Sequence, residues 1–203
     1  MTASARICSS VERAVAALHE GLMIALPTDT VYGLVVDPKR SGAAARLARA
    51  KGRHVEVPVQ VLVSGMDQAL ALGEWSLSAI QGARVLWPGA ATIVVPRLRG
   101  LALDLGGDSS TIGIRWPAHV LAARLCELFG PVAATSANIH GEAPLETAAE
   151  VARTFADEVA VVLDGGPCRD AASTVVDLTS GTPRILREGS MSEAAIRDAF
   201  GDC

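Results

Sequence analysis

Apolar and polar positions along this chain follow two periods, which predict strands and helices in alternation. Continuous apolar runs are typical of short strands covered on both faces, and they occupy residues 22–26, 131–135 and 159–163. Residues 57–63 are a further predicted strand. Apolar residues at three- and four-residue spacing predict amphipathic helices, over residues 10–20, 41–51, 76–86, 118–129 and 192–200. Helices interleaved with buried strands indicate an α/β fold whose sheet is mixed rather than purely parallel.

Shorter patterns complete this outline. Three further segments have strand character, namely 31–36, 92–95 and 111–115. Segments 173–178 and 184–187 flank a Thr-Ser-Gly-Thr-Pro turn and predict a hairpin. Ser9 with Glu12 three residues later forms a capping-box pattern for the first helix, and Gly21 can end that helix.

Length and composition indicate a single domain over residues 1–203. Domains run roughly 100–200 residues, and the chain contains no repeat, low-complexity segment or linker. The formal net charge of -4 lacks the basic excess of nucleic-acid-binding domains. We therefore expect at most weak binding of nucleic acid by this chain alone, although a local basic cleft is compatible with the charge.

Cysteines and apolar segments predict a cytoplasmic protein. The four cysteines, at positions 8, 126, 168 and 203, form no Cys-x-x-Cys pair, so we expect free thiols in a reducing compartment. The apolar run Leu22–Leu26 is too short for a signal peptide, and no stretch approaches the roughly 20 apolar residues that span a bilayer.

Five polar segments gather after buried strands or at helix ends, and strand ends are where open α/β sheets bind ligands. The first, Pro27-Thr-Asp-Thr-Val-Tyr-Gly33, holds two hydroxyls, a carboxylate and the only tyrosine of the chain. It is either part of a binding site or a proline-initiated turn in which Thr28 and Asp29 cap local amides.

The second segment is Lys51-Gly52-Arg53, at the end of a predicted helix. A cation there can complement the helix dipole. However, the chain has sixteen arginines and only two lysines, and Arg46 and Arg49 already serve that end of the helix. A lysine at position 51 therefore indicates a need for a compact point charge.

The other three segments supply a guanidinium or small polar groups. Arg115 ends a strand, where it can extend to the surface or clamp a phosphate or carboxylate. Ser136 and Asn138 are common loop residues, but together with loop amides they can hold phosphate oxygens and a ribose. Ser173 and Arg187 lie on the predicted hairpin.

Several motifs of well-known enzyme classes are absent from the sequence. There is no GxxxxGK[ST] phosphate loop and no GxGxxG dinucleotide fingerprint. There is also no GxSxG nucleophile elbow and no HExxH zinc motif, and the four histidines form no pair at metal-ligand spacing. We therefore expect no protein-held metal.

Taken in order, these segments resemble the YrdC (TsaC) family of threonylcarbamoyl-AMP synthases. The matching features are Pro27-Thr-Asp-Thr-Val-Tyr-Gly-Leu34, Lys51-x-Arg53, Trp87-Pro-Gly89, Gly113-Ile-Arg115-x-Pro117, Ser136-Ala-Asn138, Ser173-Thr-Val-Val-Asp177 and Ile185-Leu-Arg187-x-Gly189. Each motif is weak alone, but seven in one order are a specific signal. The chain ends where the YrdC domain ends, so the extra domain of the longer Sua-type members is not expected.

This resemblance implies a twisted open mixed sheet with flanking helices around a large basic cleft. It also implies an enzyme that uses Mg²⁺-ATP, L-threonine and bicarbonate. A carbamate formed on the amine of threonine attacks the α-phosphate and expels pyrophosphate. The product, threonylcarbamoyl-AMP, then goes to a partner enzyme that modifies adenosine 37 of tRNA.

By the same resemblance, each candidate residue faces one of the two main substrates. Threonine would be bound by Thr30, Arg115 and Ser173. The nucleotide and its phosphates would be bound by Lys51, Arg53, Thr111, Ser136, Asn138 and Arg187, with Lys51 and Arg53 catalytic. The requirement is physical, because an anionic carbamate can approach an anionic phosphate only where positive charge and amide donors gather.

The sequence departs from the family pattern at two places, the first of which lies beside the proposed substrate pocket and bears on substrate choice. The proline and the polar residue that often follow Lys-x-Arg are replaced by His54-Val-Glu-Val57. Pro-Gly-Pro becomes Pro88-Gly89-Ala90. The alternatives to a threonylcarbamoyl-AMP synthase are a carbamoyl-adenylate-forming relative and a non-catalytic paralogue that binds nucleotide or RNA.

Overall fold

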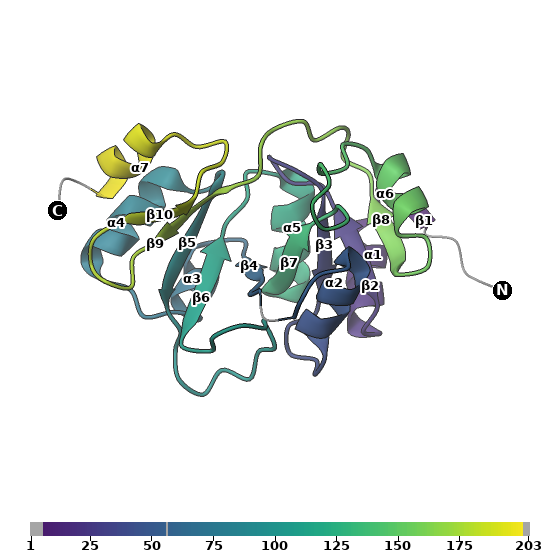
Figure 1. Ribbon diagram of the computed structural model, residues 1–203. Helices are drawn as coiled ribbons and strands as arrows, with labels where there is room; N and C mark the ends of the chain where they lie inside the picture. The colour runs from purple at the N-terminus through teal and green to yellow at the C-terminus, as the bar shows by residue number, and fades with distance from the viewer. Residues whose placement is uncertain (1–5, 56, 201–203) are drawn as a thin grey trace.

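A single mixed sheet forms the centre of the computed structural model, which describes residues 6–55 and 57–200 (Figure 1). Its strands are β1 (Arg6–Cys8), β2 (Met23–Leu26), β3 (Gly33–Val36), β4 (Gln60–Leu62), β5 (Ala91–Pro96), β6 (Thr111–Arg115), β7 (Val132–Ser136), β8 (Val159–Leu163), β9 (Thr174–Asp177) and β10 (Arg184–Arg187). The helices are α1 (Val11–His19), α2 (Ala43–Lys51), α3 (Met66–Leu70), α4 (Leu77–Leu86), α5 (Val120–Phe129), α6 (Ala148–Thr154) and α7 (Glu193–Phe200).

The strand order is β1-β8-β2-β3-β7-β4-β6-β5-β9-β10. The sheet contains parallel pairs, such as β4 with β6 and β5 with β9, and antiparallel pairs, such as β4 with β7 and β5 with β6. The predicted mixed α/β sheet with flanking helices is therefore confirmed. So is the hairpin, because β9 and β10 pair antiparallel.

Two apolar layers hold the helices against the sheet. In the first layer, α1 and α5 bury Ala14, Leu18 and Leu125 against strand residues such as Ile24 and Val132. The second layer is larger and includes α2, α4 and α6 together with the opposite side chains of the same strands. Alternation of side chains along each strand is what divides the residues between the layers. Within the described residues, no helix has the length and apolar character needed to cross a bilayer.

The segment after β8 crosses most of the sheet to reach β9 (Figure 1). Two contacts hold it against the loop between β2 and β3. Tyr32 Oη donates to the carbonyl of Gly166 at 2.8 Å, and Cys168 Sγ donates to the carbonyl of Thr28 at 3.2 Å. This crossing carries the chain from one half of the sheet to the other and positions Ser173 directly before β9.

Some predicted boundaries were wrong. Ser10, not Ser9, caps α1, because its hydroxyl accepts a hydrogen bond from the amide of Arg13 at 3.3 Å. The strand predicted over 57–63 shortens to β4, since Pro58 has no amide hydrogen for a ladder. The pattern also missed three short elements, β1, α3 and α6, although Thr147 and Glu150 form a complete capping box on α6. Cys8, Cys126 and Cys168 are free thiols, and Cys203 lies outside the described residues.

Candidate active site

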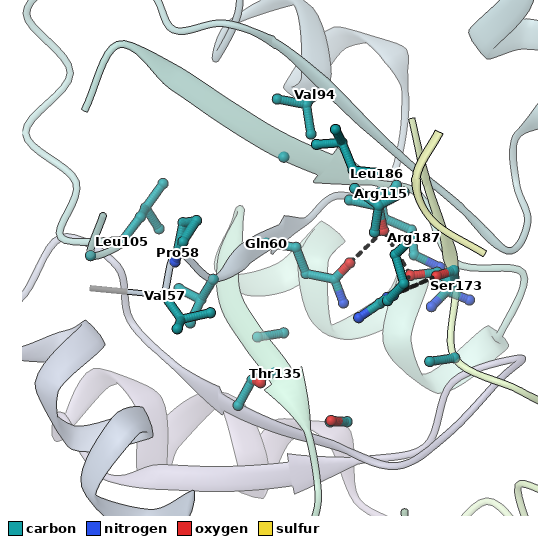
Figure 2. Close-up of a pocket in the computed structure, with 18 of the residues that line it drawn as sticks. Val57, Pro58, Gln60, Val94, Leu105, Arg115, Thr135, Ser173, Leu186 and Arg187 are labelled. Carbon is teal, nitrogen blue, oxygen red and sulfur yellow. Dashed lines mark hydrogen bonds between the residues drawn. The ribbon is translucent and has the colours of Figure 1, made fainter. Parts of the chain in front are cut away.

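A cavity of about 410 Å³ opens over the middle of the sheet (Figure 2). Strands β4, β5, β6, β7, β9 and β10 all contribute to its lining. Its cationic side chains are Lys51, Arg53, Arg115 and Arg187, and Asp108 is the one carboxylate among the described lining residues. This surplus of positive charge favours an anionic ligand.

Lys51 lies at the end of α2 but does not extend into solvent. Its side chain is buried, with 3% of the residue exposed. Nζ donates to the carbonyl of Ser136 at 2.6 Å, to the carbonyl of Asn138 at 2.9 Å and to Asn138 Oδ1 at 2.6 Å, and Ser136 Oγ lies 3.2 Å away. A role as a helix-end charge on the surface is therefore excluded, because the ammonium faces the loop after β7.

The same contacts hold the loop after β7 in one conformation. Ser136 Oγ donates to Asn138 Oδ1 at 2.6 Å, and Asn138 Nδ2 donates to the carbonyls of Ile139 and Glu142. Burial, and then the nearby charge of Arg53, lowers the pKa of Lys51 to about 8. An anion bound next to the ammonium would offset that cost, because an opposite charge favours the protonated form.

Arg53 makes fewer hydrogen bonds to the described residues than the other cationic side chains of the cavity do. Its Nη2 makes one long contact, 3.4 Å from the carbonyl of Val57, and its Nε is buried without a hydrogen-bond partner among the described residues. Burial lowers the pKa of its guanidinium. An unpaired buried donor is costly, so this side chain is well suited to donate a hydrogen bond to an incoming phosphate oxygen.

Arg115 is held by hydrogen bonds from its guanidinium to the loop between β2 and β3. Only 1% of the residue is exposed, and its guanidinium donates to Asp29 Oδ1 at 2.7 Å, to Thr30 Oγ1 at 2.8 Å and to the carbonyl of Gly89 at 3.0 Å. The loop that begins at Pro27 therefore fixes the position of this arginine. Burial lowers the pKa of Arg115, and the charge of Asp29 partly offsets that effect.

A chain of hydroxyls links Arg187 to β4. Arg187 Nη2 donates to the carbonyl of Ser173 at 2.7 Å and to Ser173 Oγ at 3.1 Å. Ser173 Oγ lies 2.8 Å from Thr92 Oγ1, which donates to Gln60 Oε1 at 2.6 Å. In Figure 2 the labelled side chains of Gln60 on β4, Ser173 directly before β9 and Arg187 on β10 lie close together.

The structure brings together the residues that the sequence singled out, with one difference in placement. Thr30 does not line the cavity; its hydroxyl supports Arg115 from behind. The other predicted residues all line the cavity, namely Lys51, Arg53, Thr111, Arg115, Ser136, Asn138, Ser173 and Arg187. Val57 and Pro58, from the segment that departs from the family pattern, form an apolar part of the wall.

Sequence reasoning missed Gln60 and Thr92. Gln60 interrupts the otherwise apolar segment Val57–Val63, and Thr92 is the polar residue that begins the apolar segment Thr92–Val95. These polar positions were the available signal. Both face the cavity because their neighbours Val61 and Ile93 face the opposite apolar layer.

Chemically, the cavity can bind an extended anion and hold a second acidic group beside it. It offers an ammonium, three guanidinium groups and several hydroxyls in a low-dielectric setting, where such donors stabilise developing negative charge most strongly.

The chain is similar to several known proteins along most of its length. A putative threonylcarbamoyl-AMP synthase of Mycobacterium tuberculosis is 42% identical over 193 residues, which are 93% of this chain and 88% of that protein. The threonylcarbamoyl-AMP synthase of Pyrococcus abyssi is 35% identical over 188 residues, 91% of this chain and 55% of that protein. A crystal structure of P. abyssi Sua5 complexed with L-threonine superposes with a TM-score of 0.88 at 34% identity, covering 94% of this chain and 57% of that one.

The family assignment follows from the extent of these matches. The family model of Sua5, YciO and YrdC, described as telomere recombination, matches residues 16–189. A match of that length, together with relatives above 30% identity along nearly all of the sequence, establishes that this chain belongs to the Sua5/YciO/YrdC family.

Proposed function

We propose that this chain is a threonylcarbamoyl-AMP synthase that uses L-threonine, bicarbonate and ATP and releases pyrophosphate. The observation that carries the proposal is the cavity in which Lys51, Arg53, Arg115 and Arg187 meet. Family relatives carry the name of this activity, and one was solved with L-threonine.

The nucleotide would occupy the side of the cavity next to α2 and the loop after β7. Lys51 and Arg53 neutralise phosphate charge there, while Ser136, Asn138 and Thr111 supply hydroxyl and amide groups. Arg187 reaches the same space from β10. Lys51 and Arg53 act as catalytic cations because charge develops on the α-phosphate and on the leaving pyrophosphate during the transfer.

The amino acid would bind near β9 and Arg115. Its amine combines with bicarbonate, with loss of water, to give a carbamate. One carbamate oxygen then bonds to the α-phosphorus as the bond to pyrophosphate breaks. Arg115 and Ser173 would bind the amino acid, and Thr30 and Asp29 would hold Arg115 in place.

Mg²⁺ would enter with ATP rather than through a site built by this chain. The described residues contain no group of three or more potential metal-binding side chains. The donors of the cavity are mostly cationic and hydroxyl groups, with Asp108 as its carboxylate. Mg²⁺ typically binds in such sites through substrate phosphates and water.

The product would serve a partner enzyme that forms N6-threonylcarbamoyladenosine at position 37 of tRNA. The net charge of -4 supports a direct contact with tRNA that is weak at most.

Pyrophosphate release tests the proposed function. We expect release from Mg²⁺-ATP only when L-threonine and bicarbonate are both present, and clearly less release with L-serine. Equal turnover with serine, or with no amino acid, would remove the threonine assignment. Turnover with a carbamoyl donor in place of threonine would indicate the carbamoyl-adenylate relative, and complete inactivity would favour a non-catalytic binding protein.

The pKa of Lys51 predicts a pH dependence of ATP binding. Since burial lowers this pKa to about 8, the free protein loses the ammonium charge as the pH rises through that value. We expect the Kd for ATP to increase by up to roughly tenfold per pH unit between about pH 8 and 9.5, where the ATP phosphates no longer titrate. Calorimetric titration measures this change.

The control for the pH dependence is Lys51→Arg. Arginine stays charged throughout this range, so its Kd for ATP, although weaker, should not change with pH. A wild-type Kd that stays constant from pH 7.5 to 9.5 would contradict the assignment of Lys51 to phosphate binding.

A further inference from the structure

Gln60 lines the cavity, and the family resemblance assigns it no role. It begins β4, half-buried, at the floor of the cavity. Its neighbour Val61 faces the opposite apolar layer, so Gln60 must face the cavity. A polar side chain in this position interrupts a strand that is otherwise apolar, from Val57 to Val63.

Gln60 reaches Thr92 across an intervening strand. The two residues lie on β4 and β5, which are separated by β6 and therefore by about 10 Å of sheet. Gly113 lies on β6 between them, and a Cβ there would be 3.4 Å from Thr92 Cγ2. Because Gly113 has no side chain, β6 places none over the cavity at this point, and the length of glutamine suits the span between β4 and β5.

The direction of these hydrogen bonds follows from the single proton that each hydroxyl group can donate. Thr92 has one hydroxyl proton, which it donates to Gln60 Oε1, so its oxygen accepts from Ser173. Ser173 uses its own proton in that bond and accepts from Arg187 Nη2. The chain therefore runs from the guanidinium through two hydroxyls to the amide oxygen of Gln60.

This direction leaves the amide nitrogen of Gln60 facing the cavity. Nε2 has no hydrogen-bond partner in the part of the chain that the structure describes, and in Figure 2 the nitrogen of Gln60 points away from the dashed hydrogen bond that its oxygen accepts. Donation from Arg187 through the chain polarises the amide and strengthens Nε2 as a donor. The cavity thus presents an oriented donor beside Arg187 and Ser173.

We propose that Gln60 Nε2 donates a hydrogen bond to the carboxylate of the amino-acid substrate. The proposal rests on the proposed function, since it assigns a further contact to the same site. Ser173, which belongs to the same hydrogen-bonded chain, lies on the side of the cavity assigned to the amino acid. The Lys51 cluster with Ser136 and Asn138 is a separate network.

Gln60→Glu tests this assignment sharply. Glutamate keeps an oxygen for Thr92 to donate to, but it replaces the amino group that faces the cavity with a second oxygen. A hydrogen bond from a neutral donor to a charged acceptor is lost and a repulsion is added, so we expect the Kd for L-threonine to rise about ten- to hundredfold. The Kd for ATP should change less than threefold.

Three further measurements separate recognition from structure. Gln60→Leu removes the donor without adding charge and should also raise the Kd for L-threonine, by a smaller factor. The preference for L-threonine over L-threoninamide, whose amide can pair with a glutamate oxygen, should fall in Gln60→Glu. Gln81→Glu makes the same chemical change on the exposed surface of α4 and should leave both ligands unaffected.

The possible outcomes distinguish the two proposals. A wild-type protein that neither binds L-threonine nor releases pyrophosphate would overturn the proposed function and this assignment with it. Wild-type threonine binding that Gln60→Glu leaves unchanged would overturn the role of Gln60 alone. An equal loss of ATP and threonine affinity in folded Gln60→Glu would overturn it as well, because it would indicate a general disturbance of the cavity.

Discussion

Lys51→Arg is expected to lower the rate of pyrophosphate release by about 10²–10³ while the protein stays folded. Lys51 Nζ lies 2.6–2.9 Å from three oxygens of the loop after β7 and is almost fully buried. A planar guanidinium is wider than an ammonium and cannot occupy the same point among those oxygens. Loss of one aligned cationic donor typically has an effect of this size on the chemical step.

The same substitution also has a structural cost. Because the space around Nζ is filled, the larger head group should shift the loop at Ser136 and Asn138, which costs about 1–3 kcal/mol as other overpacked sites do. The melting temperature should fall by several degrees. If Lys51 only complemented the dipole of α2, both turnover and stability would be nearly unchanged.

Lys39→Arg is the matched control, since Lys39 is the other lysine of the chain and is exposed. Circular dichroism and pyrophosphate release should be measured on the same preparations. Lys51→Met, which is close in size, preserves the test if the arginine variant does not fold. A well-folded Lys51→Arg protein with near-wild-type turnover would rule out a catalytic role for this lysine.

Asp29→Ala is expected to destabilise the protein by about 3 kcal/mol or more. Asp29 pairs with Arg115 at 2.7 Å, and the two side chains are 16% and 2% exposed. Removing one partner of a buried ion pair leaves the other charge uncompensated, which typically costs 3–5 kcal/mol. For a chain of this length, a cost of 3 kcal/mol lowers the melting temperature by roughly 6–12 °C.

Urea unfolding of Asp29→Ala should be compared with that of Glu127→Ala. Glu127 pairs with Arg124 at 3.1 Å on the surface, where both side chains are about half exposed. Exposed pairs contribute about 0–1 kcal/mol, so this control should unfold almost as the wild-type protein does. Equal unfolding midpoints for the two variants would show that Arg115 does not depend on Asp29.

Local patterns in the sequence were sufficient for most of the secondary structure. The continuous apolar runs became β2, β7 and β8, because strands covered on both faces need apolar residues at successive positions. Errors occurred where the signal was short. Ser9 and Ser10 are both good capping residues, so the sequence could not choose between them, whereas the backbone placed Ser10 at the cap.

Most candidate site residues could also be found from the sequence, since motifs preserve residue type and order. What the sequence alone determined about this protein is the α/β class, the strand and helix segments, and the set of polar residues that end them. These properties depend on the period of side chains along the chain and on nearby capping groups, which are local.

Only the tertiary structure decided which of those residues meet. Lys51 contacts Asn138, Arg115 contacts Asp29, and Gln60 contacts Thr92. The two residues of each pair are far apart in the sequence. The order β7-β4-β6-β5-β9 brings the elements that carry these residues to one part of the sheet, although they are distant along the chain. Gln60 faces the cavity because side chains alternate along β4, and Thr30 lies behind the cavity wall because the loop between β2 and β3 packs against Arg115 of β6. Neither placement depends on local sequence, because each is set by contacts between elements that are distant along the chain.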